Sequence, residues 1–180
     1  TRKWTSLQAT AATAGFVGLG SELVVSASGV SVSINQASVV GDAVVDYSLD
    51  AGTAADLTDR MTELSVATGT GSSLALELDG AQGELLQASG TLDINVFGFV
   101  ALSGDMAVSK STQSVTLSDA TTVSVNVLTI GGTGLSAFAG IGGGYTDGVL
   151  NAGATGLSLT GVEFGLALMS EAATPTRKWT

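Results

Sequence analysis

Thr91-Leu92-Asp93-Ile94-Asn95-Val96 is the stretch that decides the fold, because polar and aliphatic residues alternate there without a break. A period of two places the aliphatic side chains on one side of an extended chain and the polar ones on the other. Gly98 follows closely and favours a turn. The stretch therefore predicts a half-buried β-strand that ends in a tight turn.

The same alternation recurs along most of the chain, at 30–35, 42–50, 74–79, 114–118, 123–127 and 157–160. Glycine, with 25 copies, separates these runs and suits short strands joined by tight turns. Aromatic residues make up only 5% of the chain, so Val, Leu, Ile, Ala and Gly must fill the interior. We predict an all-β fold: an elongated, layered β-sheet unit, β-solenoid-like, whose sheets continue between units. A tandem Greek-key β-sandwich is the alternative.

The two ends of the chain carry the same five residues. Thr1-Arg2-Lys3-Trp4-Thr5 returns as Thr176-Arg177-Lys178-Trp179-Thr180, and these segments hold both tryptophans. We interpret this as a tandem repeat, with residues 1–175 as one unit and 176–180 as the start of the next. Pro175, the only proline, lies at the junction. Trp4, Pro175 and Trp179 are therefore the residues expected to pack where neighbouring repeats meet. The alternative is a tag or cloning scar at each end.

Composition excludes several classes of function. The 16 acidic residues outnumber the 6 basic ones, and the net charge of -10 leaves no basic patch for nucleic acid. The chain has no Cys and no His, which removes disulfides, thiolate and imidazole metal sites, and the usual general base of hydrolases. No apolar run has the length of a membrane-spanning helix. We expect neither an enzyme nor a membrane span.

Four aspartates are candidates for a Ca²⁺ site, since hard cations prefer carboxylate oxygens. Asp42, Asp46 and Asp50 are spaced by four residues in a strand pattern and would form an acidic ladder. Asp147 lies in the glycine-rich stretch 142–148. The simpler interpretation is a solvated strand face for the ladder and a glycine turn for Asp147. No resident cofactor is expected, and Ca²⁺ is the one ion these carboxylates suggest.

Three longer strings carry a resemblance to a known class of protein. They are GFVGLGSELVVSASGVSVSINQAS at 15–38, LDINVFGFVALSGDMAV at 92–108, and LSAFAGIGGGYTDGVLNAGATGLSLTGVEFGLALM at 135–169. They resemble the long repeats of giant secreted bacterial proteins that begin with a LEPR-XLL segment or carry RTX-type export signals. The resemblance implies an extracellular, cell-surface location and an adhesin-like role.

These observations lead to one expected function and two alternatives. We expect a structural repeat of a very long extracellular bacterial fibre or adhesin stalk, which forms a rigid cell-surface filament. Its partners would be neighbouring identical repeats of the same chain, together with lateral fibre–fibre contacts. The first alternative is an adhesin module that binds a carbohydrate or a partner with calcium support. The second is a subunit of a filament or sheath that assembles without covalent linkage.

Overall fold

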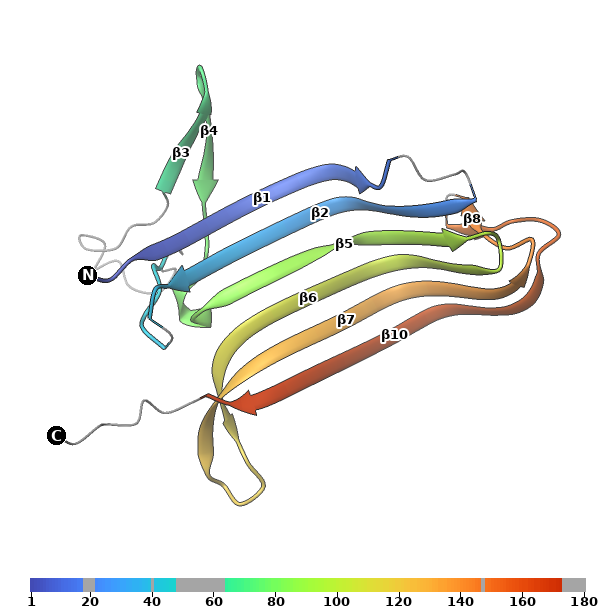
Figure 1. The fold of residues 1–180 in the computed structure, drawn as a ribbon. Helices are drawn as coiled ribbons and strands as arrows, with labels where there is room; N and C mark the ends of the chain where they lie inside the picture. Colours follow the sequence, from blue (N-terminus) through green and yellow to red (C-terminus); the bar gives the residue numbers. More distant parts are fainter. Residues whose placement is uncertain (18–21, 40, 48–63, 147, 173–180) are drawn as a thin grey trace.

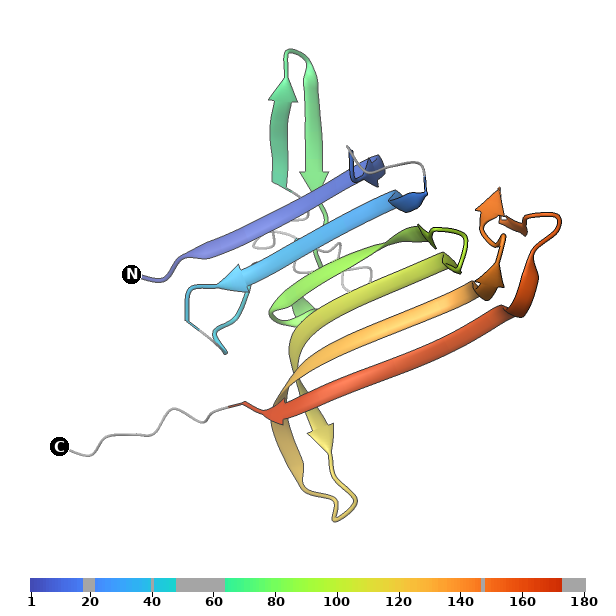
Figure 2. The same ribbon diagram turned by 45° about the vertical axis from the view of Figure 1, so that its right-hand side comes forward.

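The computed structural model describes residues 1–17, 22–39, 41–47, 64–146 and 148–172. Six long strands form one antiparallel sheet in the order β1-β2-β5-β6-β7-β10, so each strand lies beside the next long strand of the chain (Figure 1). Two small hairpins interrupt this meander: β3-β4 between β2 and β5, and β8-β9 between β7 and β10. The β3-β4 hairpin projects away from the large sheet (Figure 2).

The strands of the large sheet are unusually long, and the elements between them are short. The large sheet contains β1 (Trp4–Gly15), β2 (Leu23–Ala37), β5 (Leu85–Val96), β6 (Val100–Thr116), β7 (Thr122–Ile141) and β10 (Thr155–Glu171). The remaining elements are β3 (Leu64–Gly69), β4 (Ser72–Leu76), a single 3-10 turn η1 (Gly80–Gln82), β8 (Tyr145–Thr146) and β9 (Val149–Leu150).

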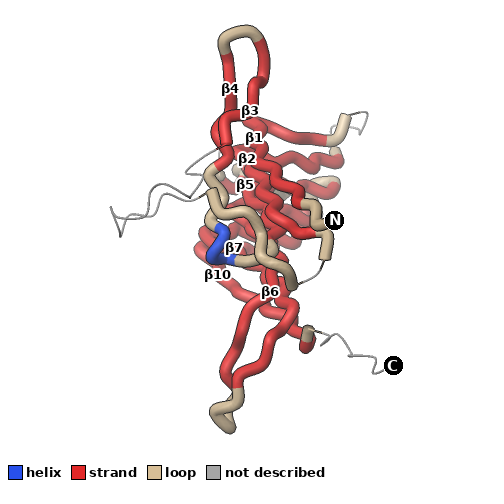
Figure 3. Tube along the Cα trace, turned by 90° about the vertical axis from the view of Figure 1, so that its left-hand side faces the viewer, coloured by secondary structure: helices blue, strands red, loops and turns tan. Residues whose placement is uncertain are grey.

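The all-β prediction is confirmed, and so are strands at 30–35, 91–96, 123–127 and 157–160. The predicted runs 74–79 and 114–118 are strands only as far as Leu76 and Thr116. Within the described residues the long strands form a single open antiparallel sheet, and neither the coils of a solenoid nor two sheets packed face to face are seen. The reason lies in the connections: β5 joins β6, and β6 joins β7, through tight turns that bring each strand back beside its predecessor. Figure 3 shows these strands stacked as one layer.

Alternation gives the large sheet two chemically different sides. Following the register from strand to strand, one side, which we call the apolar face, carries Leu7, Val30, Val32, Ile34, Leu86, Leu92, Ile94, Leu102, Met106, Val108, Leu128, Ile130, Leu135, Phe164, Leu166 and Leu168. The opposite side, the polar face, carries Ser6, Gln8, Ser31, Ser33, Asn35, Ser89, Thr91, Asp93, Ser103, Asp105, Ser109, Ser111, Thr129 and Thr133. Toward the ends of the sheet this side also carries Leu85, Val125, Val127 and Phe138, which are buried.

The described segments outside the large sheet reach its polar face. At one end, Asn35 Nδ2 donates to the carbonyl of Val45, and the Tyr47 hydroxyl donates to Ser6 Oγ, which holds the segment 41–47 against the sheet. Tyr47 packs with Leu76, Leu78 and Val45 in a small core. At the other end, the chain at Gly143 lies against the Phe138 ring, which is buried. The polar face is thus covered at both ends, and only Leu135 of the apolar face is fully buried.

Glycine bulges cross the sheet in a line and bend its strands. Register shifts occur in β2 near Gly29, in β7 near Gly134, and in β10 near Gly161. All three glycines have positive φ, at 58°, 59° and 65°. A bulge with a left-handed residue kinks its strand and increases the local twist. Because the bulges are aligned, the long strands curve together (Figure 1).

The predicted strand at 42–50 is wrong for its described part. Residues 43–47 form neither helix nor strand, although the Tyr47 N–H donates to the carbonyl of Leu78. The alternation there reflects the packing of Val45 and Tyr47 into the small core rather than membership of a sheet. The remainder, including Asp50, lies outside the described residues.

Candidate functional site

The two outer strands of the large sheet are the main candidate surface for function. Among the described residues, β1 pairs only with β2, and β10 pairs only with β7. Each therefore leaves one side of its backbone without a strand partner, and such an edge is a template for pairing with another strand. The two edges are 12 and 17 residues long.

Neither edge strand has the features that usually prevent pairing. Proteins protect exposed edges with prolines, with charged side chains or with very short strands. β1 contains no proline and no charged residue, and β10 contains no proline and only Glu163 and Glu171 as charges. Glu163 is already engaged, because its Oε1 accepts a hydrogen bond from Thr133 on the polar face. Both edges are thus open to another strand.

The directions of the two edges are opposite. β1 runs away from the end of the sheet where the N-terminus lies, and β10 returns to that same end (Figure 1). This follows from the topology, because a meander with an even number of antiparallel strands begins and ends at the same side. A translated copy could therefore place its β1 beside β10 in antiparallel orientation.

The alternation of hydrogen-bonded and non-hydrogen-bonded pairs between β7 and β10 identifies which amides of β10 face outward. The Ala172 N–H donates to the carbonyl of Ser124, so residue 172 belongs to a hydrogen-bonded pair with β7. Such pairs alternate with non-bonded ones in an antiparallel ladder. Leu166 and Leu168 therefore bond to β7, whereas the N–H groups of Ala167 and Met169 point to the free edge.

Trp4 makes its contacts within its own unit. Its Nε1 donates to the carbonyl of Ala43 over 2.9 Å, and Arg2 Cζ lies 5.6 Å from the ring centroid, in cation–π range. The side chain remains 44% exposed. Trp4 thus ties the start of β1 to the segment 41–47 and leaves part of its ring accessible. Pro175 and Trp179, the other predicted junction residues, lie outside the described residues.

The predicted calcium ligands are not brought together where the structure describes them. Asp46 Oδ1 accepts from the Gly80 N–H, so Asp46 serves to hold the η1 turn. Asp42 lies in the turn that follows β2, and Asp50 and Asp147 fall outside the described residues. Over residues 1–17, 22–39, 41–47, 64–146 and 148–172, no three acidic side chains gather as a metal site would require.

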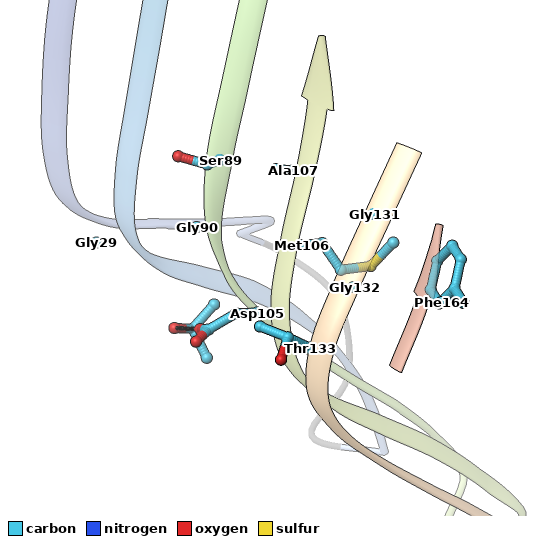
Figure 4. Close-up of a pocket in the computed structure, with 11 residues that line it drawn as sticks. Gly29, Ser89, Gly90, Asp105, Met106, Ala107, Gly131, Gly132, Thr133 and Phe164 are labelled. Carbon is cyan, nitrogen blue, oxygen red and sulfur yellow. Dashed lines mark hydrogen bonds between the residues drawn. The ribbon is translucent and has the colours of Figure 1, made fainter. Parts of the chain in front are cut away.

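A groove of about 560 Å³ crosses the bent middle of the sheet, a feature that sequence analysis missed. Gly90, Gly131 and Gly132 expose bare backbone along it, while Met106 and Phe164 supply apolar side chains. Asp105 and Phe164 lie toward opposite ends of it (Figure 4). The Asp105 carboxylate is engaged by the Thr91 hydroxyl. The hydroxyls of Ser89 and Thr133 also line the groove, so its wall combines apolar side chains, bare backbone and polar groups.

The glycines at this groove are required by close packing. A Cβ at Gly132 would lie 2.6 Å from Leu135 Cδ1 and 2.7 Å from the Phe164 ring. A Cβ at Gly104 would lie 2.8 Å from Leu135 Cα. Leu135 therefore sits in space that side chains at these positions would otherwise fill. The signal in the sequence was the clustering of glycines inside strands, which marks bulges and close backbone approach.

Comparison with family models, curated proteins and solved structures gives no match to this chain. In the described part of the chain, no helix is long and apolar enough to cross a membrane.

Proposed function

We propose that residues 1–175 are one repeat of a very long extracellular bacterial fibre or adhesin stalk, in which β10 of each repeat pairs with β1 of the next. The observation that carries this proposal is the combination of duplicated ends with two open, oppositely directed sheet edges. The function is mechanical: a continuous hydrogen-bonded sheet stiffens the filament and projects or spaces what it carries.

The chain between the edges has a suitable length. Seven residues, 172–178, separate Glu171 at the end of β10 from Trp179, the equivalent of Trp4 in the following repeat. Adjacent strands lie only ~4.8 Å apart, whereas seven residues reach up to ~23 Å when extended. Because β10 ends at the side of the sheet where β1 begins, a short connection joins them as an ordinary antiparallel hairpin.

Charge and location are consistent with an extracellular filament. A unit of residues 1–175 holds all 16 acidic residues and four basic ones, Arg2, Lys3, Arg60 and Lys110, so each repeat adds a net charge of -12. Long arrays repel one another unless cations screen them, which keeps the filaments soluble. The extracellular bacterial location rests on the resemblance to repeats of giant secreted proteins.

The proposal is tested in a protein of two consecutive repeats carrying a change at the internal β10 edge. Ala167→Pro in the first repeat removes an N–H that points away from β7, so it blocks the β10–β1 junction while leaving the β7–β10 ladder intact. Ala167→Thr, which keeps the N–H, is the matched control. The proline should lower the free energy of unfolding of the two-repeat protein by ~2 kcal/mol or more.

The same proline in the single 180-residue chain should cost much less, because its edge is already unpaired there. Equal losses in the one-repeat and two-repeat proteins would overturn the junction. The size of the natural polypeptide on a denaturing gel distinguishes covalent tandem repeats from a filament whose subunits assemble without covalent linkage. A band far above the 17.7 kDa of this chain supports tandem repeats, and a band near that mass supports subunits joined through the same edges.

A further inference from the structure

The apolar face of the sheet has no second layer within the described part of the chain. Leu86, Leu166 and Leu168 on it are 38%, 45% and 53% exposed. The contacts made by the segment 41–47 and by the chain near Gly143 go to the polar face instead. A sheet with one apolar side is stable when that side is buried against another element, so the described sheet has a side to which a second layer can be added.

We infer that the apolar face packs against the apolar face of a second copy of this unit, giving a two-layer β-sandwich between neighbouring filaments or neighbouring repeats. The inference rests on the proposed function, since it takes the partner to be another repeat. In the proposed tandem array, further copies lie in the same chain and are therefore present at high local concentration.

The size of the face meets what a stable interface needs. Six strands ~4.8 Å apart span ~24 Å, and twelve residues of each strand span ~40 Å, which gives ~1,000 Å² per copy. Stable protein–protein interfaces bury ~800 Å² on each partner. A self-complementary contact also uses the same patch twice, as two-fold related subunits do.

The distribution of charge permits the contact despite the acidic composition. Among the residues of the six strands, the carboxylates of Asp93, Asp105 and Glu163 lie on the polar face, as their partners Ser103, Thr91 and Thr133 indicate. Glu171 falls on that face by its register. Lys110 is the one charged strand residue on the apolar side. Like charges are thus kept away from the proposed contact.

Leucine side chains project from the apolar face at its edge strand. Leu166 and Leu168 are each about half exposed there. Projecting aliphatic side chains of this kind interdigitate when two sheet faces pack at a separation of ~10 Å.

The test uses the 180-residue chain with Ala167→Pro, so that pairing at the β10 edge is blocked, and follows its mass by sedimentation. Val108→Lys charges the middle of the apolar face, and Ser109→Lys makes the same change at the next residue, on the polar face. We expect the Ala167→Pro chain and its Ser109→Lys variant to sediment as dimers. The Val108→Lys variant should sediment as a monomer with unchanged circular dichroism, and its dimer dissociation constant should rise at least tenfold.

A second measurement covers the case in which Val108→Lys does not fold. The chain has no cysteine, so Val108→Cys and Ser109→Cys each introduce a single reactive thiol. A short bismaleimide should link the Val108→Cys chains into dimers and should leave the Ser109→Cys chains as monomers.

Three results would overturn the inference. If the Ala167→Pro chain sediments as a monomer, the face-to-face contact does not form. This result would not bear on the β10–β1 junction, which the two-repeat protein tests separately. If the chain without Ala167→Pro associates and Val108→Lys does not weaken this association, but Ala167→Pro abolishes it, all contacts between copies belong to the sheet edges. A monomer that binds phosphatidylcholine vesicles, and loses this binding with Val108→Lys, would assign the apolar face to lipid.

Discussion

Asn35 is the polar side chain on which the packing of one end of the sheet depends. It is 1% exposed; its Oδ1 accepts from Ser6 Oγ over 3.1 Å, and its Nδ2 donates to the carbonyl of Val45 over 2.7 Å. The Tyr47 hydroxyl completes the chain by donating to Ser6 Oγ. These bonds connect β1, β2 and the segment 41–47, so a single amide fixes the irregular segment on the sheet.

Replacement of Asn35 by Ala should therefore be costly. It leaves the Val45 carbonyl without its donor and Ser6 without its acceptor, and it opens a small cavity. We expect a loss of ~2 kcal/mol in the free energy of unfolding. Gln36→Ala, at the exposed neighbouring position, should change it by less than ~0.5 kcal/mol. Urea denaturation of the two variants measures the difference, and equal values would show that the buried network contributes nothing.

The carboxyl of Asp119, in the turn between β6 and β7, has a lowered pKa. The Thr121 hydroxyl donates to Asp119 Oδ1, and so does the Thr121 N–H, and these bonds lower the pKa of the Asp119 carboxyl below its usual 3.8. A carboxyl with a lowered pKa adds stability above its unfolded pKa, and that contribution is lost as the pH falls through the lower folded value.

Thr121→Val removes the larger cause and should raise the pKa of Asp119 toward 3.8. Carbon-detected NMR titration of the Asp119 carboxyl measures this directly. Thr122→Val, at the adjacent position that begins β7, is the matched control and should leave the titration unchanged. An identical midpoint in the wild-type and Thr121→Val chains would contradict the role given to the hydroxyl.

At the scale of the strand, the aligned bulges are the feature that shapes the sheet. Gly104 has a φ of 143° and lies against Leu135, whereas a Cβ at Gly165 would meet nothing within 4 Å. Gly104→Ala should therefore cost at least ~2 kcal/mol in free energy of unfolding, from backbone strain and overlap with Leu135. Gly165→Ala should be neutral or slightly stabilising. Thermal denaturation compares the two, and a tolerated Gly104→Ala would show that the close contact of Gly104 with Leu135, opposite the β7 bulge, is dispensable.

The strands themselves could be predicted from the sequence where an alternating run of polar and apolar residues also has strand partners in the sheet. The runs around Val32, Ile94 and Val125 are strands because each lies between two hydrogen-bonded partners. The run around Val45 alternates equally well, yet its backbone lies across the sheet and bonds to Leu78. Local alternation indicates which side chains are buried, but it does not indicate which element of the fold covers them.

The order of the strands and the line of bulges could not be predicted in the same way. Register depends on pairings between residues far apart in the chain, such as Trp4 with Ala37 or Asp105 with Thr133. Gly29, Gly134 and Gly161 are distant in sequence, and only the register shows that their bulges align. For the candidate site, the duplicated ends predicted a junction, but the free edges that we propose for it became visible only with the topology.

At the scale of the whole molecule, three surfaces of one sheet account for the proposed filament. In this proposal the two edges join repeats along the chain, the polar face holds the four acidic residues of the six strands and the covering segments, and the apolar face is left for a second layer. This division explains how a strongly acidic chain with few aromatic residues can still form an ordered assembly. Stability in such an array grows with the number of junctions, because each repeat covers the edge of its neighbour.

The most direct test of the central claim is the thermal denaturation of proteins with one, two and three consecutive repeats. If β10 of each repeat pairs with β1 of the next, the melting temperature should rise with each added repeat, with the largest step from one to two. The two-repeat protein with Ala167→Pro in its first repeat should melt near the single repeat. Equal melting temperatures for all three lengths would mean that the repeats fold independently and would contradict the continuous sheet.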